Sequence, residues 1–261
     1  MRIRTIINKE WSEVFKNRMV LMTVGLLPLL FTAIPLIQLA VTRTFDPGNM
    51  NSMPTSLALQ CHLEQLSDTE CLQSFLSNQF MLFFLLMPLA IPVIIASYSI
   101  VGEKITRSLE PLLATPISTS EIILGKALAA SIPAIIATWG SFVIFLVVAR
   151  FLVVSDRVYA GIVNPMWLVA IFLVAPLMTV LSVNVAIIIS SRVSDPRTAE
   201  QLGMVVMIPL LGIFFAQIFG LIALNVTSMF LMAIAVLMLD FVLVGIGVKL
   251  FQREAILTRW K

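Results

Sequence analysis

The sequence predicts an all-α polytopic membrane protein with six transmembrane helices, and three observations lead to this fold class. First, 59% of the 261 residues are hydrophobic and only 12% are charged, whereas about a quarter of the residues in a soluble domain are charged. Second, six apolar runs are each near the roughly 20 residues that a helix needs to cross a bilayer. Third, the basic residues are unevenly divided between the connecting segments. The length accommodates a single integral domain over residues 1–261.

Residues 1–18 predict an interfacial helix ahead of the first span. Apolar residues recur there at helical spacing: Ile3, Ile6, Ile7, Trp11, Val14 and Phe15. Charged residues take the remaining surface: Arg2, Arg4, Lys9, Glu10, Glu13 and Lys16. This pattern is typical of a helix that lies on an anionic membrane leaflet. An ordinary basic flank to the first span is the alternative, but it does not account for the apolar stripe.

The predicted transmembrane helices occupy residues 19–41, 80–101, 127–149, 166–191, 202–224 and 229–248. The boundary between the fifth and sixth is the least defined, because no charged residue occurs from 201 to 239 and residues 225–228 are the only polar break. A partly re-entrant segment near that break is an alternative to two full spans. Before the fifth span, a charged turn places Asp195 or Thr198 where either side chain would cap the next helix.

The basic residues predict the topology. With the N-terminus inside, only three of the 17 basic residues fall in outer segments, namely Arg43, Arg150 and Arg157. Basic residues concentrate on the cytoplasmic side of membrane proteins. We therefore expect a multi-pass protein of the plasma (inner) membrane with both termini in the cytoplasm. This sorting explains the net charge of +3 without a nucleic-acid partner.

The predicted extracytoplasmic loop, residues 42–79, contains both cysteines of the chain, Cys61 and Cys71. An even pair on the oxidising side favours a disulfide that closes a small loop, with two free thiols as the alternative. His62, the only histidine, lies between them. Since these three side chains would leave a metal without a fourth ligand, no metal site is predicted.

Residues 103–117 form a charged interruption between the second and third spans. Its charged side chains exclude it from hydrocarbon. Leu109, Leu112 and Leu113 nevertheless recur at i, i+3 and i+4, with Pro111 in the expected first turn and Pro116 at the end. The pattern predicts a short amphipathic helix at the membrane surface that could receive a push from a soluble partner. An ordinary polar loop is the alternative.

This segment closely resembles the first cytoplasmic loop of ABC-2 type permeases, the membrane subunits of ATP-binding-cassette exporters. The likeness rests on Glu103-Lys104-x-x-Arg107-Ser108-Leu109-Glu110-Pro111-Leu112-Leu113-Ala114-Thr115-Pro116, followed by Glu121-Ile122-x-x-Gly125-Lys126. In that family the loop forms a coupling helix that docks on the ATPase subunit. The resemblance carries this role onto Glu103, Lys104, Arg107, Leu109, Glu110, Pro111, Leu112, Leu113, Thr115 and Pro116.

The resemblance also implies the partners. A separate ABC ATPase subunit would bind ATP and Mg, and a second permease subunit, identical or different, would complete the export path. No cofactor is expected on this chain, and it is not expected to be an enzyme. A phosphate loop requires G-x-x-x-x-G-K-[ST], but Ser120 and Ala127 occupy the outer positions around Gly125-Lys126. The family exports diverse cargoes, so the likeness does not name one.

Asp240 lies inside the sixth predicted span. A carboxylate in a transmembrane segment is by default a candidate functional group. One interpretation is pairing with a polar group on another helix, such as Asn184 or Gln217, or simple protonation; the other is a role in transport. The second interpretation supports a rival function, an ion- or proton-coupled secondary transporter that uses Asp240 and needs no ATPase.

Overall fold

The computed structural model describes residues 2–44, 66–106 and 119–250. These residues are helical throughout, apart from turns, and contain no strand. In the first half of the chain the described residues form four helices: α1 (Arg2–Val14), α2 (Arg18–Thr44), α4 (Asp68–Ile105) and α6 (Thr119–Leu152). Six helical segments among the described residues are long and apolar enough to cross a membrane, which confirms the predicted fold class.

The fourth and fifth spans are each assembled from several helical pieces. The fourth consists of α7 (Asp156–Ile162), α8 (Pro165–Val169), the π-helical segment η2 (Ala170–Val174) and α9 (Ala175–Arg192). The fifth consists of α10 (Pro196–Gly203), the 3₁₀ segment η3 (Met204–Met207) and α11 (Ile208–Ile218). The sixth is the single helix α12 (Val226–Leu250).

α4 is the central helix of the bundle. Its most apolar stretch is 89% buried, against 17% for α2 and 11% for the fifth span. It packs mainly against α9, α6 and α2 and also contacts α1, α7, α10 and α11. Movement of α4 would therefore change its contacts with nearly every other helix.

α4 begins at Asp68, whereas the apolar run that predicted it begins at residue 80. A capping box starts the helix: Ser67 Oγ accepts the Glu70 backbone N–H, and the Glu70 carboxylate accepts the Ser67 backbone N–H at 2.9 Å. Some polar residues of this first part are buried rather than solvated. Gln73 and Gln79 are 0% and 4% exposed. Part of the segment predicted as outer loop is thus helical core.

The break between the fifth and sixth spans lies earlier than residues 225–228. α11 ends at Ile218, and Gly220 adopts a φ of 69° that favours glycine. Asn225 then begins α12, since its side chain accepts the Ser228 backbone N–H at 2.8 Å. The predicted turn, residues 225–228, is only the polar end of the observed break, which begins among apolar residues after Ile218.

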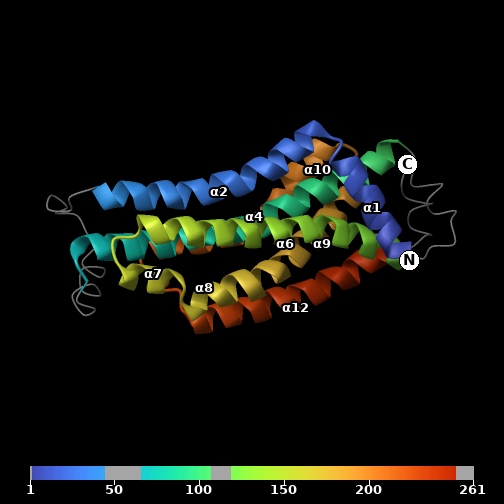
Figure 1. Ribbon diagram of the computed structural model, residues 1–261. Coiled ribbons are helices and arrows are strands. Elements are labelled where there is room, and N and C mark those ends of the chain that lie inside the picture. The colour runs from blue at the N-terminus through green and yellow to red at the C-terminus, as the bar shows by residue number, and fades with distance from the viewer. Residues whose placement is uncertain (1, 45–65, 107–118, 251–261) are drawn as a thin grey trace.

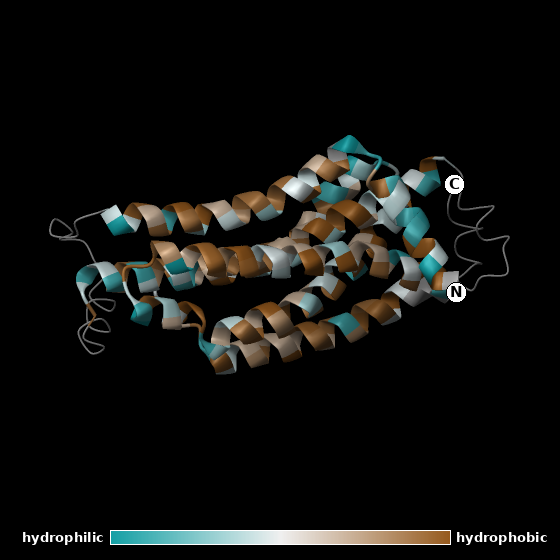
Figure 2. Ribbon diagram, viewed as in Figure 1, coloured by the Kyte–Doolittle hydropathy of each residue, from teal (hydrophilic) through white to brown (hydrophobic). Residues whose placement is uncertain are grey.

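α1 and the end of α12 lie at the same end of the bundle (Figure 1). Figure 2 shows hydrophobic residues along the lengths of the long helices and hydrophilic residues gathered toward the two ends. This distribution is that of a bundle whose sides face lipid and whose ends face water.

Candidate coupling site

The buried face of α1 contains a carboxylate. Ile6, Glu10 and Val14 follow one another at four-residue intervals and are 6%, 2% and 6% exposed. This face packs against α6 and α4. Glu10 was predicted on the charged surface of α1, and this assignment is wrong, because Glu10 is buried. Phe15, predicted on the apolar stripe, follows the end of α1 and is 42% exposed.

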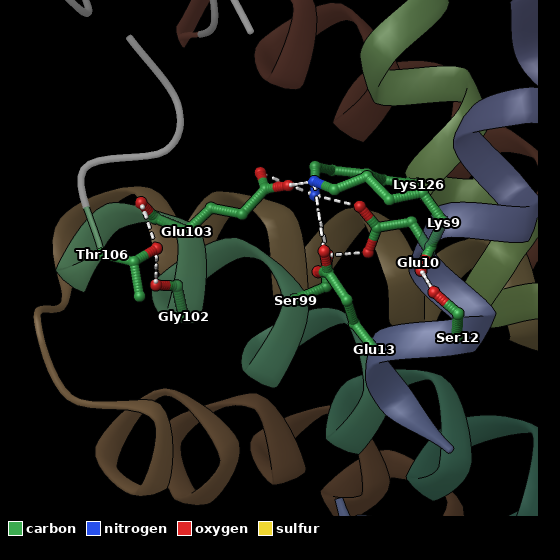
Figure 3. Close-up of polar contacts among 9 residues, drawn as sticks. All are labelled: Lys9, Glu10, Ser12, Glu13, Ser99, Gly102, Glu103, Thr106 and Lys126. Atoms are coloured by element: carbon green, nitrogen blue, oxygen red, sulfur yellow. Dashed lines mark hydrogen bonds and ion pairs between the residues drawn. The ribbon is translucent and has the colours of Figure 1, made fainter. Parts of the chain in front are cut away.

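Lys126, near the start of α6, neutralises two buried carboxylates at once (Figure 3). Its Nζ lies 2.6 Å from Glu10 Oε1 and 2.8 Å from Glu103 Oε2. The three side chains are 7%, 3% and 5% exposed, so the pairs are shielded from water. Buried charges of this kind are stable only when they are paired and hydrogen-bonded. The arrangement therefore joins α1, α4 and α6 at one point.

Ser99 and Lys9 complete this polar cluster, which we define as Lys9, Glu10, Ser99, Glu103 and Lys126. Ser99 Oγ accepts a hydrogen bond from Lys126 Nζ at 2.8 Å and donates one to the Glu10 carboxylate. Lys9 Nζ lies 2.6 Å from Glu103 Oε1. Burial lowers the pKa of Lys9, but the hydrogen bond from its ammonium to the Glu103 carboxylate and the charge of that group outweigh this effect and leave the pKa above its usual range. The cluster holds two ammonium groups and two carboxylates in one connected set.

Two further contacts hold α1 against α6. Trp11 Nε1 donates to the backbone carbonyl of Ala129 at 2.9 Å. Gly125 lies directly under Ile6, and a Cβ at position 125 would approach Ile6 Cγ2 to 2.8 Å. Close approach of α1 therefore requires glycine at this position. The Gly-Lys pair that contributed to the family resemblance is thus a packing residue followed by an ion-pair residue.

The cluster lies at both ends of the predicted coupling segment. Glu103 is in the last turn of α4, which Thr106 caps, and α6 resumes at Thr119. Lys104 extends the connection, since its Nζ donates to the Val193 carbonyl at 3.2 Å in the turn between α9 and α10. Glu103 thus contacts α6, and Lys104 beside it contacts the turn between α9 and α10.

The turn at Val193 is itself fixed by a capped helix. The Asp195 carboxylate accepts the Thr198 backbone N–H at 2.8 Å and begins α10, which confirms the predicted cap. That backbone hydrogen bond, and to a lesser extent the hydrogen bond from the Thr198 hydroxyl, holds the pKa of Asp195 below its usual range.

The predicted coupling residues divide into two groups. Glu103 and Lys104 are described, and both contact other parts of the chain. The others lie outside the described residues: Arg107, Leu109, Glu110, Pro111, Leu112, Leu113, Thr115 and Pro116. Sequence reasoning missed Lys9, Glu10 and Ser99. The position of Glu10, halfway between Ile6 and Val14 at four-residue spacing, was the signal that could have indicated it.

The remaining predicted site residues lie elsewhere. Cys71 is buried in the first turn of α4, whereas Cys61 lies outside the described residues, so the disulfide between them stays a prediction. Asp240 is 5% exposed on α12. It belongs to a different part of the bundle from the polar cluster, since α12 packs mainly against α9.

The fold and the charge distribution define a multi-pass helical membrane protein whose buried charges gather at the α1 end of the bundle. Residues 4–244 match the model of the ABC-2 family transporter proteins, and the chain belongs to that family. It is therefore a membrane permease of an ABC transporter. Comparison with curated proteins finds no match.

Proposed function

We propose that this chain is the permease subunit of an ATP-driven exporter and that residues 103–116 dock on a separate ATPase subunit. In this proposal the ATPase binds ATP and Mg, and two permease subunits form the export path between them. The observation that carries the proposal is the buried polar cluster at the ends of residues 107–118. Family membership supports a partner ATPase.

The cluster is suited to transmit a force. Glu103 begins the segment, Lys126 lies in the first part of the helix that follows it, and the two side chains are joined at 2.8 Å, so a push on the segment acts on α4 and α6 together. Glu10 adds α1 to the same unit. Since α4 is buried along most of its length, its displacement must change the packing of α2 and α9. Packed helices respond to such shifts by moving between discrete arrangements.

The proposal predicts a membrane orientation. The α1 end of the bundle faces the cytoplasm, in agreement with the distribution of basic residues. A thiol reagent that cannot cross membranes should label Leu112→Cys only from the cytoplasmic side, in a Cys61→Ser, Cys71→Ser background. Labelling of Leu112→Cys only from the exterior would exclude the proposal.

Co-purification tests the partner. We expect an ATP-hydrolysing subunit to accompany the full chain from its native membrane and to be lost from the Glu110→Ala, Leu113→Ala variant. Arg157→Ala, Val163→Ala is the matched control, because both residues are exposed on or beside α7, at the opposite end of the bundle. Equal recovery of the ATPase with both double variants would contradict docking at residues 103–116.

A second candidate function follows from one specific observation, the carboxyl of Asp240 buried inside a transmembrane helix. An ion- or proton-coupled secondary transporter would use this group and need no ATPase. Proteoliposomes that contain the purified chain alone distinguish the two functions. A proton flux that is abolished by Asp240→Asn supports the secondary transporter, and its absence supports ATP-driven export.

A further inference from the structure

Asp240 lies on the face of α12 that packs against the rest of the bundle. Met229, Ala233, Val236 and Asp240 follow one another at intervals of three or four residues and are 0%, 5%, 6% and 5% exposed. Its neighbours in sequence point outward, since Leu239 and Phe241 are 52% and 73% exposed. The carboxyl therefore points into the contact between α12 and α9, inside an otherwise apolar span.

No ion pair joins a cation of the described residues to this carboxyl. The elements packed closely against α12 are α9, η2 and α8. The sequence of α8 and η2 contains no titratable group, and the only one on α9 is Arg192 in its last turn. The other charged residue of α12 is Lys249, more than two turns beyond Asp240. An ionised Asp240 would thus be a buried charge without a partner, the costliest state that a carboxyl can adopt.

Asn184 of α9 is close enough to Asp240 for their side chains to interact. Among the described residues, however, neither carboxyl oxygen of Asp240 has a hydrogen-bond partner, and neither has Asn184 Nδ2. The buried Asp240 carboxyl and the half-buried Asn184 side chain thus lie at the same helix contact, and these three polar atoms are shielded from water without a hydrogen bond. The Asn184 amide can donate to a carboxylate or to a protonated carboxyl, but its oxygen can accept only from the protonated carboxyl, so two hydrogen bonds can join the groups only when the carboxyl carries a proton.

A proton fits this pair better than a metal ion does. Hard cations in proteins take six or more oxygen ligands, whereas one carboxyl and one amide supply three oxygens. The helical backbone around them uses its carbonyls within α9 and α12. The chemistry of the pair is therefore that of a neutral, hydrogen-bonded contact between two helices.

We propose that Asp240 and Asn184 form a proton-binding site that controls the contact between α12 and α9. The Asp240 carboxyl carries a proton while α12 is packed on α9. When α12 separates from α9, the carboxyl reaches water, its O–H bond breaks, and the proton passes to water, which leaves a solvated carboxylate. Return of α12 requires the proton to be taken up again. Asp240 lies about 10 Å from the end of its span at Gly247, so exchange occurs toward the α1 end of the bundle.

Infrared difference spectroscopy of the purified full chain in lipid nanodiscs tests protonation directly. We expect the C=O band of a protonated carboxyl at about pH 7, where an ordinary aspartate, which titrates at about pH 4, is ionised. The band should be lost on alkaline titration and be missing from Asp240→Asn. Glu13→Gln, which removes an exposed carboxylate on α1, is the matched control and should leave the band unchanged. A spectrum in which Asp240→Asn removes no protonated carboxyl at about pH 7 would overturn the proposal.

Hydrogen exchange tests the link to helix packing. Exchange of α12 backbone amides in the wild-type chain should exceed that in Asp240→Asn once the pH passes the midpoint of the infrared titration, because the asparagine variant cannot ionise. Asn184→Leu should shift that midpoint upward by up to about one pH unit, since it removes the hydrogen-bond donor that stabilises the carboxylate. Equal exchange in wild type and Asp240→Asn at every pH would refute the control of packing. Neither result depends on an ATPase, so the proposed export function is tested separately.

Discussion

The ammonium of Lys126 lies 2.8 Å from the Glu103 carboxylate and 2.6 Å from that of Glu10. One lysine therefore joins the end of α4, the start of α6 and the buried face of α1. Because all three groups are buried, the loss of this single ammonium affects two carboxylates.

Lys126→Met should destabilise the chain by about 3–5 kcal/mol, the usual effect of removing one partner of a buried ion pair. The methionine fills the space but leaves Glu10 without a counter-charge. Thermal unfolding in detergent measures the change. Lys9→Met is the control and should destabilise less, because the Lys9 side chain is 38% exposed and its loss leaves Glu103 paired with Lys126. Equal destabilisation by the two variants would contradict the central role of Lys126.

A compensated variant separates stability from coupling. Replacing Glu10, Glu103 and Lys126 together by residues of similar volume, Gln, Gln and Met, leaves no buried charge, and stability should recover substantially. If the cluster transmits movement, stimulation of the bound ATPase by the permease should stay low in this variant. Recovery of both properties would show that the cluster serves stability alone.

The approach of α1 to α6 depends on the lack of a side chain at position 125. Gly125→Ala places a Cβ 2.8 Å from Ile6 Cγ2 and should displace α1. We expect the free energy of unfolding to fall by about 1–3 kcal/mol. Gly140→Ala, on the same helix with nothing within 4 Å of the added Cβ, is the control. The displacement should appear as faster thiol labelling of Val14→Cys in the Cys61→Ser, Cys71→Ser background. Unchanged labelling in Gly125→Ala would show that the Ile6 side chain changes its conformation while α1 stays in place.

Much of this architecture could be predicted from local sequence. Six apolar runs indicated the six spans, and the sequence Asp195-Pro196-Arg197-Thr198 indicated the start of α10, because both signals depend on residues close together in the chain. The burial of Glu10 could not be predicted in this way. Its partners are Lys126 on α6 and Ser99 on α4, and no short-range pattern places them beside α1.

The start of α4 escaped prediction for a related reason. Polar residues between 68 and 79 resemble a solvated loop, yet several are buried and bind groups on other helices. Gln79 Nε2, for example, donates to the Phe214 carbonyl of α11 at 3.2 Å. Composition alone does not separate a polar residue in water from one that satisfies a backbone group in the core.

Alkaline pH should weaken the attachment of α1. The pKa of Lys9 is raised in the folded chain, so its contribution is fully present below the unfolded pKa, about 10.4, and is lost as the pH rises through the folded value. The unfolding temperature should therefore fall more steeply above about pH 10.4 in wild type than in Lys9→Arg, whose guanidinium stays charged. The same slope in both proteins would indicate that Lys9 is not the group responsible.

Gln73 connects three parts of the chain at the end of the bundle opposite α1. Its Nε2 donates to the Leu39 carbonyl of α2 at 3.2 Å, and its Oε1 accepts the Val154 backbone N–H at 3.0 Å. Since Gln73 is 0% exposed, Gln73→Leu keeps the volume but leaves a buried donor and a buried acceptor without these bonds. We expect a loss of about 1–3 kcal/mol in the free energy of unfolding. Gln201→Leu, exposed on α10, should change it by less than about 0.5 kcal/mol. If Gln73→Leu matched Gln201→Leu, water would have to replace both bonds, and α4 would be held at this end by apolar packing instead.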